Sequence, residues 1–114
     1  MKLLTCTHAV PSPPTDVRLT SIVKNSESAS VTIEWDPPSQ GGSQLNYTIT
    51  TTPDLISGPP PVTTSTSTTI TINYNTNYTI TITASNCVGN GITSDMFMFR
   101  IGKYVAMFGY IIIS

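Results

Sequence analysis

The chain has 114 residues, of which 39% are hydrophobic and only 10% charged, and its formal net charge is −1. This length predicts one domain, whose apolar core lies under a surface made polar by threonine and serine. Because no basic run is present, we expect no binding to nucleic-acid phosphates. Two cysteines and one histidine are too few for a usual zinc site, so no metal or other cofactor is expected.

The first eleven residues show no strand pattern. We expect residues 1–11 to form an unstructured leader or the start of a cut fragment. The alternative is a degraded signal peptide, although the apolar part is shorter and more polar than the usual stretch of about 7–15 residues. Pro11, Pro13 and Pro14 lack the N–H that a strand ladder needs, so we expect them at an edge or at the start of a strand.

Apolar and polar residues alternate in several stretches of the following sequence. A period of two places one set of side chains on each face of a β-strand. In the clearest case Tyr78, Ile80, Ile82 and Ala84 alternate with hydroxyl residues. About seven short strands and no helix are predicted, which is typical of an all-β, antiparallel two-sheet sandwich. The strands are expected near residues 17–22, 30–35, 45–50, 62–67, 70–72, 78–85 and 92–99.

Three large aromatic side chains, Trp35, Tyr47 and Tyr78, fall on inward positions of these strands. Inward residues of two sheets must interdigitate to form one core. A tryptophan alone buries about 150–250 Å². We therefore predict that these three residues form the structural core.

Several motifs, taken in order, resemble a fibronectin type III domain over residues 12–99. They cover a proline-led first strand, a second strand with a buried tryptophan, a third strand, a tyrosine corner, and a sixth strand with its following loop. The resemblance implies an immunoglobulin-like sandwich in which the Tyr78 hydroxyl bonds the main chain of the corner before it. Tyr74 departs from the family, which usually has proline there. The motifs are PPTDV (13–17), VTIEWDPP (31–38), LNYTI (45–49), INYNTNY (72–78) and YTITITASNCVGNGITS (78–94).

The family does not usually need a disulfide, so the resemblance favours unpaired thiols at Cys6 and Cys87. The family's topology nevertheless places the start of the first strand and the loop after the sixth strand at the same pole. A bridge is therefore conceivable if the leader folds back. That loop can carry an Arg-Gly-Asp triplet in this family, and because the triplet is absent here, integrin binding by that route is not expected.

No group of residues suggests catalysis, and we expect no enzyme. His8 is the single histidine and falls in the leader. The segment 89–91 precedes no predicted helix, so it is not a phosphate-binding loop. The acidic residues scatter over predicted loops and strand ends without a pair that suggests acid–base work. They are Asp16, Glu27, Glu34, Asp36, Asp54 and Asp95.

Two kinds of candidate site remain. Asn46 and Asn77 stand in Asn-x-Thr sequons, on outward positions beside an inward tyrosine, so a glycan there would not disturb the core. Met96 and Met98 must point outward from the last strand, at a sheet edge where exposed apolar residues invite pairing. We expect neighbouring side chains or the tail to cover both methionines; the alternative hypothesis is a protein-contact face built on Met96 and Met98.

Residues 100–114 depart from the family pattern and are expected to lie outside the domain. Residues 104–113 are apolar but reach only half of the roughly 20 residues that a membrane span needs. They are expected to be a truncated span, an added edge strand, or sequence foreign to the domain. A membrane contact is expected only in the first case.

By analogy with the family, we predict a non-catalytic extracellular module for adhesion, receptor recognition or matrix spacing. It would bind an unknown protein ligand and have neighbouring domains in a larger chain. The alternatives are a structural linker of a larger secreted enzyme or matrix protein, and an intracellular scaffold module.

Overall fold

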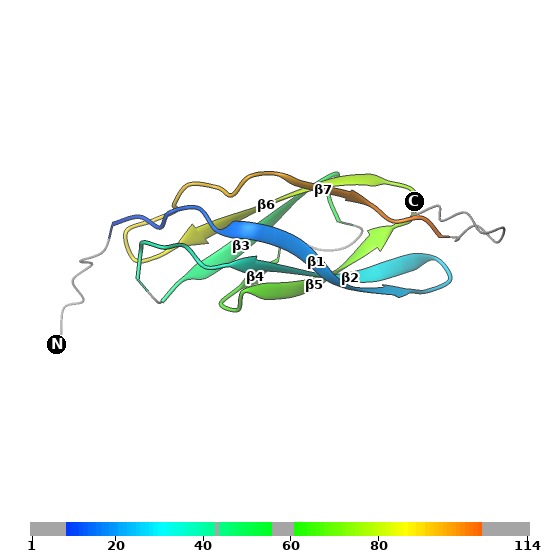
Figure 1. Cartoon of the computed structure of the whole chain (residues 1–114), viewed down its shortest axis with the longest axis horizontal. Coiled ribbons are helices and arrows are strands. Elements are labelled where there is room, and N and C mark those ends of the chain that lie inside the picture. The colour runs from blue at the N-terminus through cyan, green and yellow to red at the C-terminus, as the bar shows by residue number, and fades with distance from the viewer. Residues whose placement is uncertain (1–8, 43, 56–60, 104–114) are drawn as a thin grey trace.

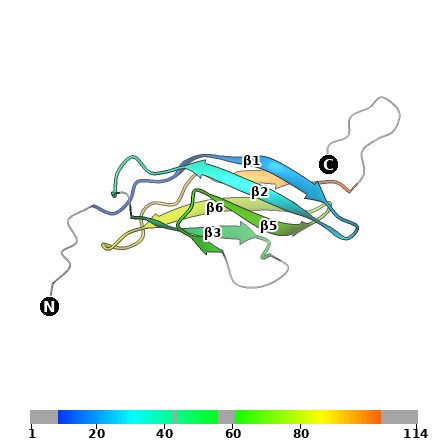
Figure 2. The ribbon, with the colours of Figure 1, turned by 90° about the horizontal axis from the view of Figure 1, so that it is seen from below.

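The computed structural model describes residues 9–42, 44–55 and 61–103. This part of the chain contains no helix, and its seven strands form two antiparallel sheets (Figures 1 and 2). One sheet has the strand order β1-β2-β5 and the other has the order β4-β3-β6-β7. The predicted all-β, two-sheet sandwich is therefore confirmed. The strands are β1 (Thr15–Lys24), β2 (Ser28–Asp36), β3 (Asn46–Thr52), β4 (Val62–Thr63), β5 (Ser67–Asn73), β6 (Asn77–Ser85) and β7 (Phe97–Arg100).

The core lies between the sheets and uses every second residue of the long strands, as the burial patterns of β2 and β6 show. The ring of Trp35 meets that of Tyr47 edge to face, with 5.3 Å between ring centroids. Tyr78 stacks on Phe99 at 5.6 Å. Trp35 and Tyr78 are 1% exposed and Tyr47 is 2% exposed. All three aromatic residues assigned to the core thus lie in it.

The turn between β5 and β6 is fixed by Tyr78. The main-chain N–H of Asn73 donates to the Tyr78 hydroxyl oxygen at 2.9 Å, which confirms the predicted corner bond. Asn75 adopts a left-handed conformation with φ of 57°, which asparagine tolerates better than most residues. The hydroxyl of Tyr74, where the family usually has proline, donates to the carbonyl of Asn25 in the β1–β2 turn. The corner is therefore tied to both sheets.

The last strand is shorter than predicted, because β7 covers only Phe97–Arg100 instead of residues 92–99. Before it, the Ser94 N–H donates to the Ile82 carbonyl, and the Ser94 hydroxyl accepts from the Ile82 N–H, both at 2.8 Å. A side chain thus takes the place of a main-chain carbonyl in the ladder. Regular pairing starts only at Phe97, opposite Ile80.

The described chain begins at one pole of the sandwich and ends at the other (Figures 1 and 2). Pro11, which the sequence analysis placed in the leader, is buried. Ile101, which it placed in the tail, belongs to the core, and its carbonyl accepts the Asn75 N–H at 2.7 Å. Cys6, His8 and residues 104–114 lie outside the described residues. Within the described ranges no helix has the length and apolarity to cross a membrane.

Candidate interaction edge at strand β7

Strand β7 is the outermost strand of its sheet, and in the described part of the chain one of its edges has no partner strand. Its other edge pairs with β6, where Phe99 faces Tyr78 and Met98 faces Thr79. Phe97 and Phe99 are partly buried and pack against the core. Because side chains alternate along a strand, Met98 must point to the outer face.

Met96 and Met98 are 68% and 70% exposed, the two largest values among the large apolar side chains that the structure describes. The predicted outward position of both residues is confirmed. Described side chains leave more than half of each methionine uncovered. An open strand edge flanked by flexible apolar side chains is suited to pairing with an extended segment of another chain.

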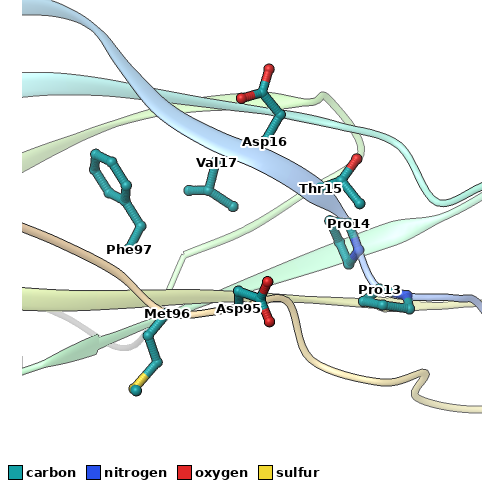
Figure 3. Close-up of a pocket in the computed structure, with 8 residues that line it drawn as sticks. All are labelled: Pro13, Pro14, Thr15, Asp16, Val17, Asp95, Met96 and Phe97. Atoms are coloured by element: carbon teal, nitrogen blue, oxygen red, sulfur yellow. The ribbon is translucent and has the colours of Figure 1, made fainter.

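A shallow hollow of about 280 Å³ lies beside this edge (Figure 3). Residues 13–17, which include the start of β1, line one side of it, and residues 95–97, which end at the first residue of β7, line the other. Val17 and Phe97 lie between the two segments, whereas Met96 and Asp16 point away in opposite directions (Figure 3). Ligand pockets usually measure about 300–1,000 Å³, so this hollow suits one side chain of a docked peptide better than a whole substrate.

A cluster of exposed charged side chains surrounds Arg18 near the hollow, and Asp95 lines the hollow itself. The Arg18 guanidinium lies 3.1 Å from the Asp16 carboxylate, 3.5 Å from that of Glu34 and 3.3 Å from that of Asp36. Exposed ion pairs of this kind contribute little to stability. Within the described ranges, no group of three or more His, Cys, Asp or Glu side chains could hold a metal ion.

The two sequon asparagines lie exposed on the four-stranded sheet, at opposite poles of it. Asn46 begins β3 and pairs with Ser85, whereas Asn77 begins β6 and pairs with Arg100. Asn77 and Met98 line one shallow depression. A glycan on Asn77 would therefore stand next to the β7 edge, whereas one on Asn46 would lie far from it.

A polar hub that no sequence pattern indicated lies at the pole where the described chain begins. The Nδ2 group of Asn86, just beyond β6, donates to the carbonyls of Ala9 at 2.7 Å and Gly41 at 3.0 Å. Its Oδ1 accepts from the N–H groups of Val88 at 2.8 Å and Gly89 at 3.3 Å. The two acceptors lie 77 and 45 residues away in sequence, so no local pattern could have indicated them.

Pro11 fills a narrow slot beside this hub. A Cβ added to Gly91 would lie 2.1 Å from the Pro11 carbonyl oxygen, and one added to Gly41 would lie 2.7 Å from the Pro11 Cα. Glycine is required at both positions, because only glycine lets another backbone approach so closely. This slot anchors the segment that continues into the wall of the hollow at residues 13–17.

Cys87 lies in the same loop and is disulfide-bonded, so the expectation of an unpaired thiol there is wrong. The hub gives the physical reason, since Asn86 holds the carbonyl of Ala9 and so brings the N-terminal segment to this loop. Cys6 is the only other cysteine of the sequence and lies outside the described residues.

The family model "Fibronectin type III domain" matches residues 12–99. The chain belongs to the fibronectin type III family. No match was found among curated proteins.

Several solved structures are similar to this fibronectin type III domain. The twitchin kinase region from C. elegans is 26% identical with a TM-score of 0.66, and the match covers 82% of this chain and 17% of that one. Titin domains A168–A170 are 22% identical with a TM-score of 0.64, over 82% and 32%. A human fourth FNIII domain is 14% identical with a TM-score of 0.68, over 94% and 92%. The chain thus spans less than a third of the first two structures.

Proposed function

We propose that this fibronectin type III domain is a non-catalytic extracellular module that binds a protein partner through the edge of β7. Domains of this family are generally non-catalytic modules. The observation that carries the proposal is the open β7 edge, where Met96 and Met98 are exposed beside the partly buried Phe97 and Phe99. A strand added there would gain main-chain hydrogen bonds, and the methionines would supply adaptable apolar contacts.

Two features support an extracellular location. Cys87 is disulfide-bonded, and disulfides persist mainly in oxidising environments such as the secretory route. Asn46 and Asn77 are exposed within their sequons, and in the described part of the chain their side chains form no hydrogen bond that a glycan would have to replace. Adhesion, receptor recognition and matrix spacing all fit such a module.

The position of the described ends supports a place within a larger chain. They lie at opposite poles of the sandwich, so a domain joined at each end would lie in series with it (Figures 1 and 2). The similar twitchin and titin structures are themselves parts of multi-domain chains. The module would then space its neighbours while its β7 edge stays accessible from the side.

The binding proposal is tested with the fluorescently labelled full chain on the surface of cells from its natural source. Met96→Ser/Met98→Ser is expected to weaken binding about tenfold, which corresponds to about 1.4 kcal/mol. The matched control Val23→Ser/Val62→Ser alters side chains that are 56% and 66% exposed on other edge strands, and is expected to bind as the parent does. Equal binding by both variants and the parent would exclude the β7 edge as the contact.

The extracellular assignment is tested by mass spectrometry of the native protein after enzymatic removal of N-linked glycans in heavy-oxygen water. Trypsin is unsuitable because no Lys or Arg lies between Lys24 and Arg100, so cleavage after aromatic residues is used. Asn46 and Asn77 are expected to appear as labelled aspartate. Protein from the natural source that carries neither label would contradict the assignment. Binding is also measured for Asn77→Gln, because a glycan at Asn77 stands beside Met98.

A further inference from the structure

A run of seven hydroxyl residues, 63–69, follows three prolines at 59–61, and the function proposed above makes no use of it. Serine- and threonine-rich sequence next to proline is typical of O-glycosylated segments. No Asp, Glu, Lys or Arg occurs from residue 55 to residue 94. This lack of charge disfavours phosphorylation, because kinases select many substrates by the charge pattern around the acceptor.

The structure exposes the middle of this run, and also Thr69, whose hydroxyl is already hydrogen-bonded to that of Thr32 at 3.1 Å. Thr63 lies in β4, and the run ends within β5, so both ends are paired in sheets. Thr64, Ser65 and Thr66 form the bend between these strands, and all three are exposed. Within the described ranges their hydroxyls make no hydrogen bond. A transferase would therefore find three accessible hydroxyls, and no hydrogen bond of theirs would have to break.

The main chain of this bend is held in place although its side chains are exposed. The N–H of the core residue Trp35 donates to the Thr66 carbonyl at 3.1 Å, and the Ser65 N–H donates to the Thr63 hydroxyl at 3.0 Å. The acceptor hydroxyls therefore stand on a fixed turn at the rim of the sandwich. Attachment of a sugar to these hydroxyls would therefore not require the core to open.

We infer that Thr64, Ser65 and Thr66 are a site of O-linked glycosylation. The sugar donor is a nucleotide sugar and the catalyst a glycosyltransferase of the secretory route, so the inference rests on the proposed extracellular function. The hydroxyl oxygen forms a bond to the anomeric carbon while the bond from that carbon to the nucleotide phosphate breaks. The hydroxyl proton passes to a base of the transferase, and nothing is oxidised or reduced.

This site would also explain how one rim of the sandwich is protected. Each sheet has two edge strands, which are β1 and β5 in one sheet and β4 and β7 in the other. The bend joins β4 to β5, and β1 and β7 are the opposite edges. Unprotected edges invite pairing with other chains. A glycan on the bend blocks approach to β4 and β5 and leaves the β7 edge for a partner.

The experiment uses the full chain secreted from cultured animal cells behind an added secretion signal, together with native protein from its source. N-linked glycans are removed and the intact mass is measured. The parent is expected to keep extra mass in whole-sugar steps, which Thr64→Ala/Ser65→Ala/Thr66→Ala removes. The control Thr15→Ala/Thr50→Ala/Thr71→Ala, which alters exposed threonines on strands, is expected to keep that mass.

The outcomes separate this inference from the proposed function. Native protein with N-linked glycans but no O-linked mass would overturn the inference alone. Native protein with neither modification would overturn both, and phosphate on the bend would overturn the inference. Extra mass that persists in the triple alanine variant would place the sugar elsewhere and would also overturn it.

Discussion

The two ends of strand β6 are both held by a single side chain, but in different ways. At its start, the ring of Tyr78 is buried against Phe99, and its hydroxyl accepts one main-chain N–H from Asn73, five residues earlier. Just beyond its other end, the half-buried Asn86 makes four hydrogen bonds, two of which reach remote segments at Ala9 and Gly41. The first end relies on apolar packing and a local bond, and the second relies on a polar network.

This difference predicts different responses to mutation. Loss of packing in a core affects the whole domain, because both sheets share that core. Loss of a polar network at one pole leaves the core in place and affects the segments that the network joins. The Tyr78 end should therefore control global stability, and the Asn86 end should control how the N-terminal segment docks beside the hollow.

The largest effect is expected for Tyr78→Ala. Removal of a buried aromatic ring costs about 3–5 kcal/mol, out of a total stability of about 5–15 kcal/mol for a domain of this kind. Urea unfolding of the unglycosylated chain should show a much lower midpoint with an unchanged slope. Phe97→Ala, at a partly buried position beside Phe99, is expected to cost less and serves as the comparison. A midpoint within error of the parent would show that the ring is not part of the core.

A smaller and more local effect is expected for Asn86→Ala. The substitution leaves two carbonyls and two N–H groups without their partner, at a cost of about 1–3 kcal/mol. Hydrogen exchange should accelerate at Ser12 and Ile92, whose N–H groups bond Gln40 and Pro11 beside the hub. The control Asn90→Ala alters an exposed residue of the same loop.

The prediction for Asn86 fails if exchange at Ser12 and Ile92 stays at the parent rate. It also fails if exchange rises equally across β2 and β6, since a general rise would mean that the hub supports the whole fold. In either case the two ends of β6 would not differ in the way proposed here.

The sequence predicted the Tyr78 end and missed the Asn86 end for a physical reason. Alternation is a local signal, and in β2 and β6 it matches burial residue by residue, which also places Trp35 in the core. Met98 could be assigned to the outer face by the same rule. The contacts of Asn86 and the Pro11 slot depend on segments that meet only after folding, so a single stretch of sequence does not contain them.

The same limit explains the errors in the strands and at Cys87. Ser94 is a polar residue that interrupts the alternation of apolar residues. Nothing in the sequence around it shows that its hydroxyl will accept the Ile82 N–H in place of a carbonyl. The predicted strand was therefore too long at its start. For Cys87, the family resemblance favoured a thiol, although its topology placed the start of the first strand at the same pole as this loop. Only the structure shows that Asn86 holds the N-terminal segment at the loop, through the carbonyl of Ala9.

Tyr78→Phe sharpens the comparison by keeping the ring and removing only the hydroxyl. The Asn73 N–H then loses its partner, and the expected cost is about 1 kcal/mol. The measurement is the free energy of unfolding in urea, with Tyr74→Phe, which removes the bond to Asn25 in the β1–β2 turn, as the comparison. If Tyr78→Phe cost as much as Tyr78→Ala, packing of the ring would not dominate at this end.

The smallest effect concerns Tyr47, which pairs with Ala84 towards the Asn86 end of β6. Burial raises the pKa of the Tyr47 hydroxyl above its ordinary value of 10.0. The folded state therefore holds this proton more tightly than the unfolded state. The resulting stability is fully present below the unfolded-state pKa of about 10 and is lost as pH rises through the folded-state pKa.

Tyr47→Phe removes this titration and keeps the ring and the Asn46 sequon. The parent should lose stability relative to Tyr47→Phe between about pH 9 and pH 11, and the two should keep a constant difference below about pH 9. Urea unfolding at each pH measures that difference, and comparison with the variant cancels the titration of the other tyrosines. A difference that stays constant up to pH 11 would mean that solvent reaches the Tyr47 hydroxyl. The dry core would then end before it reaches the Asn86 pole. Solvent would enter the sandwich more easily at the end with the polar hub than at the end with Tyr78.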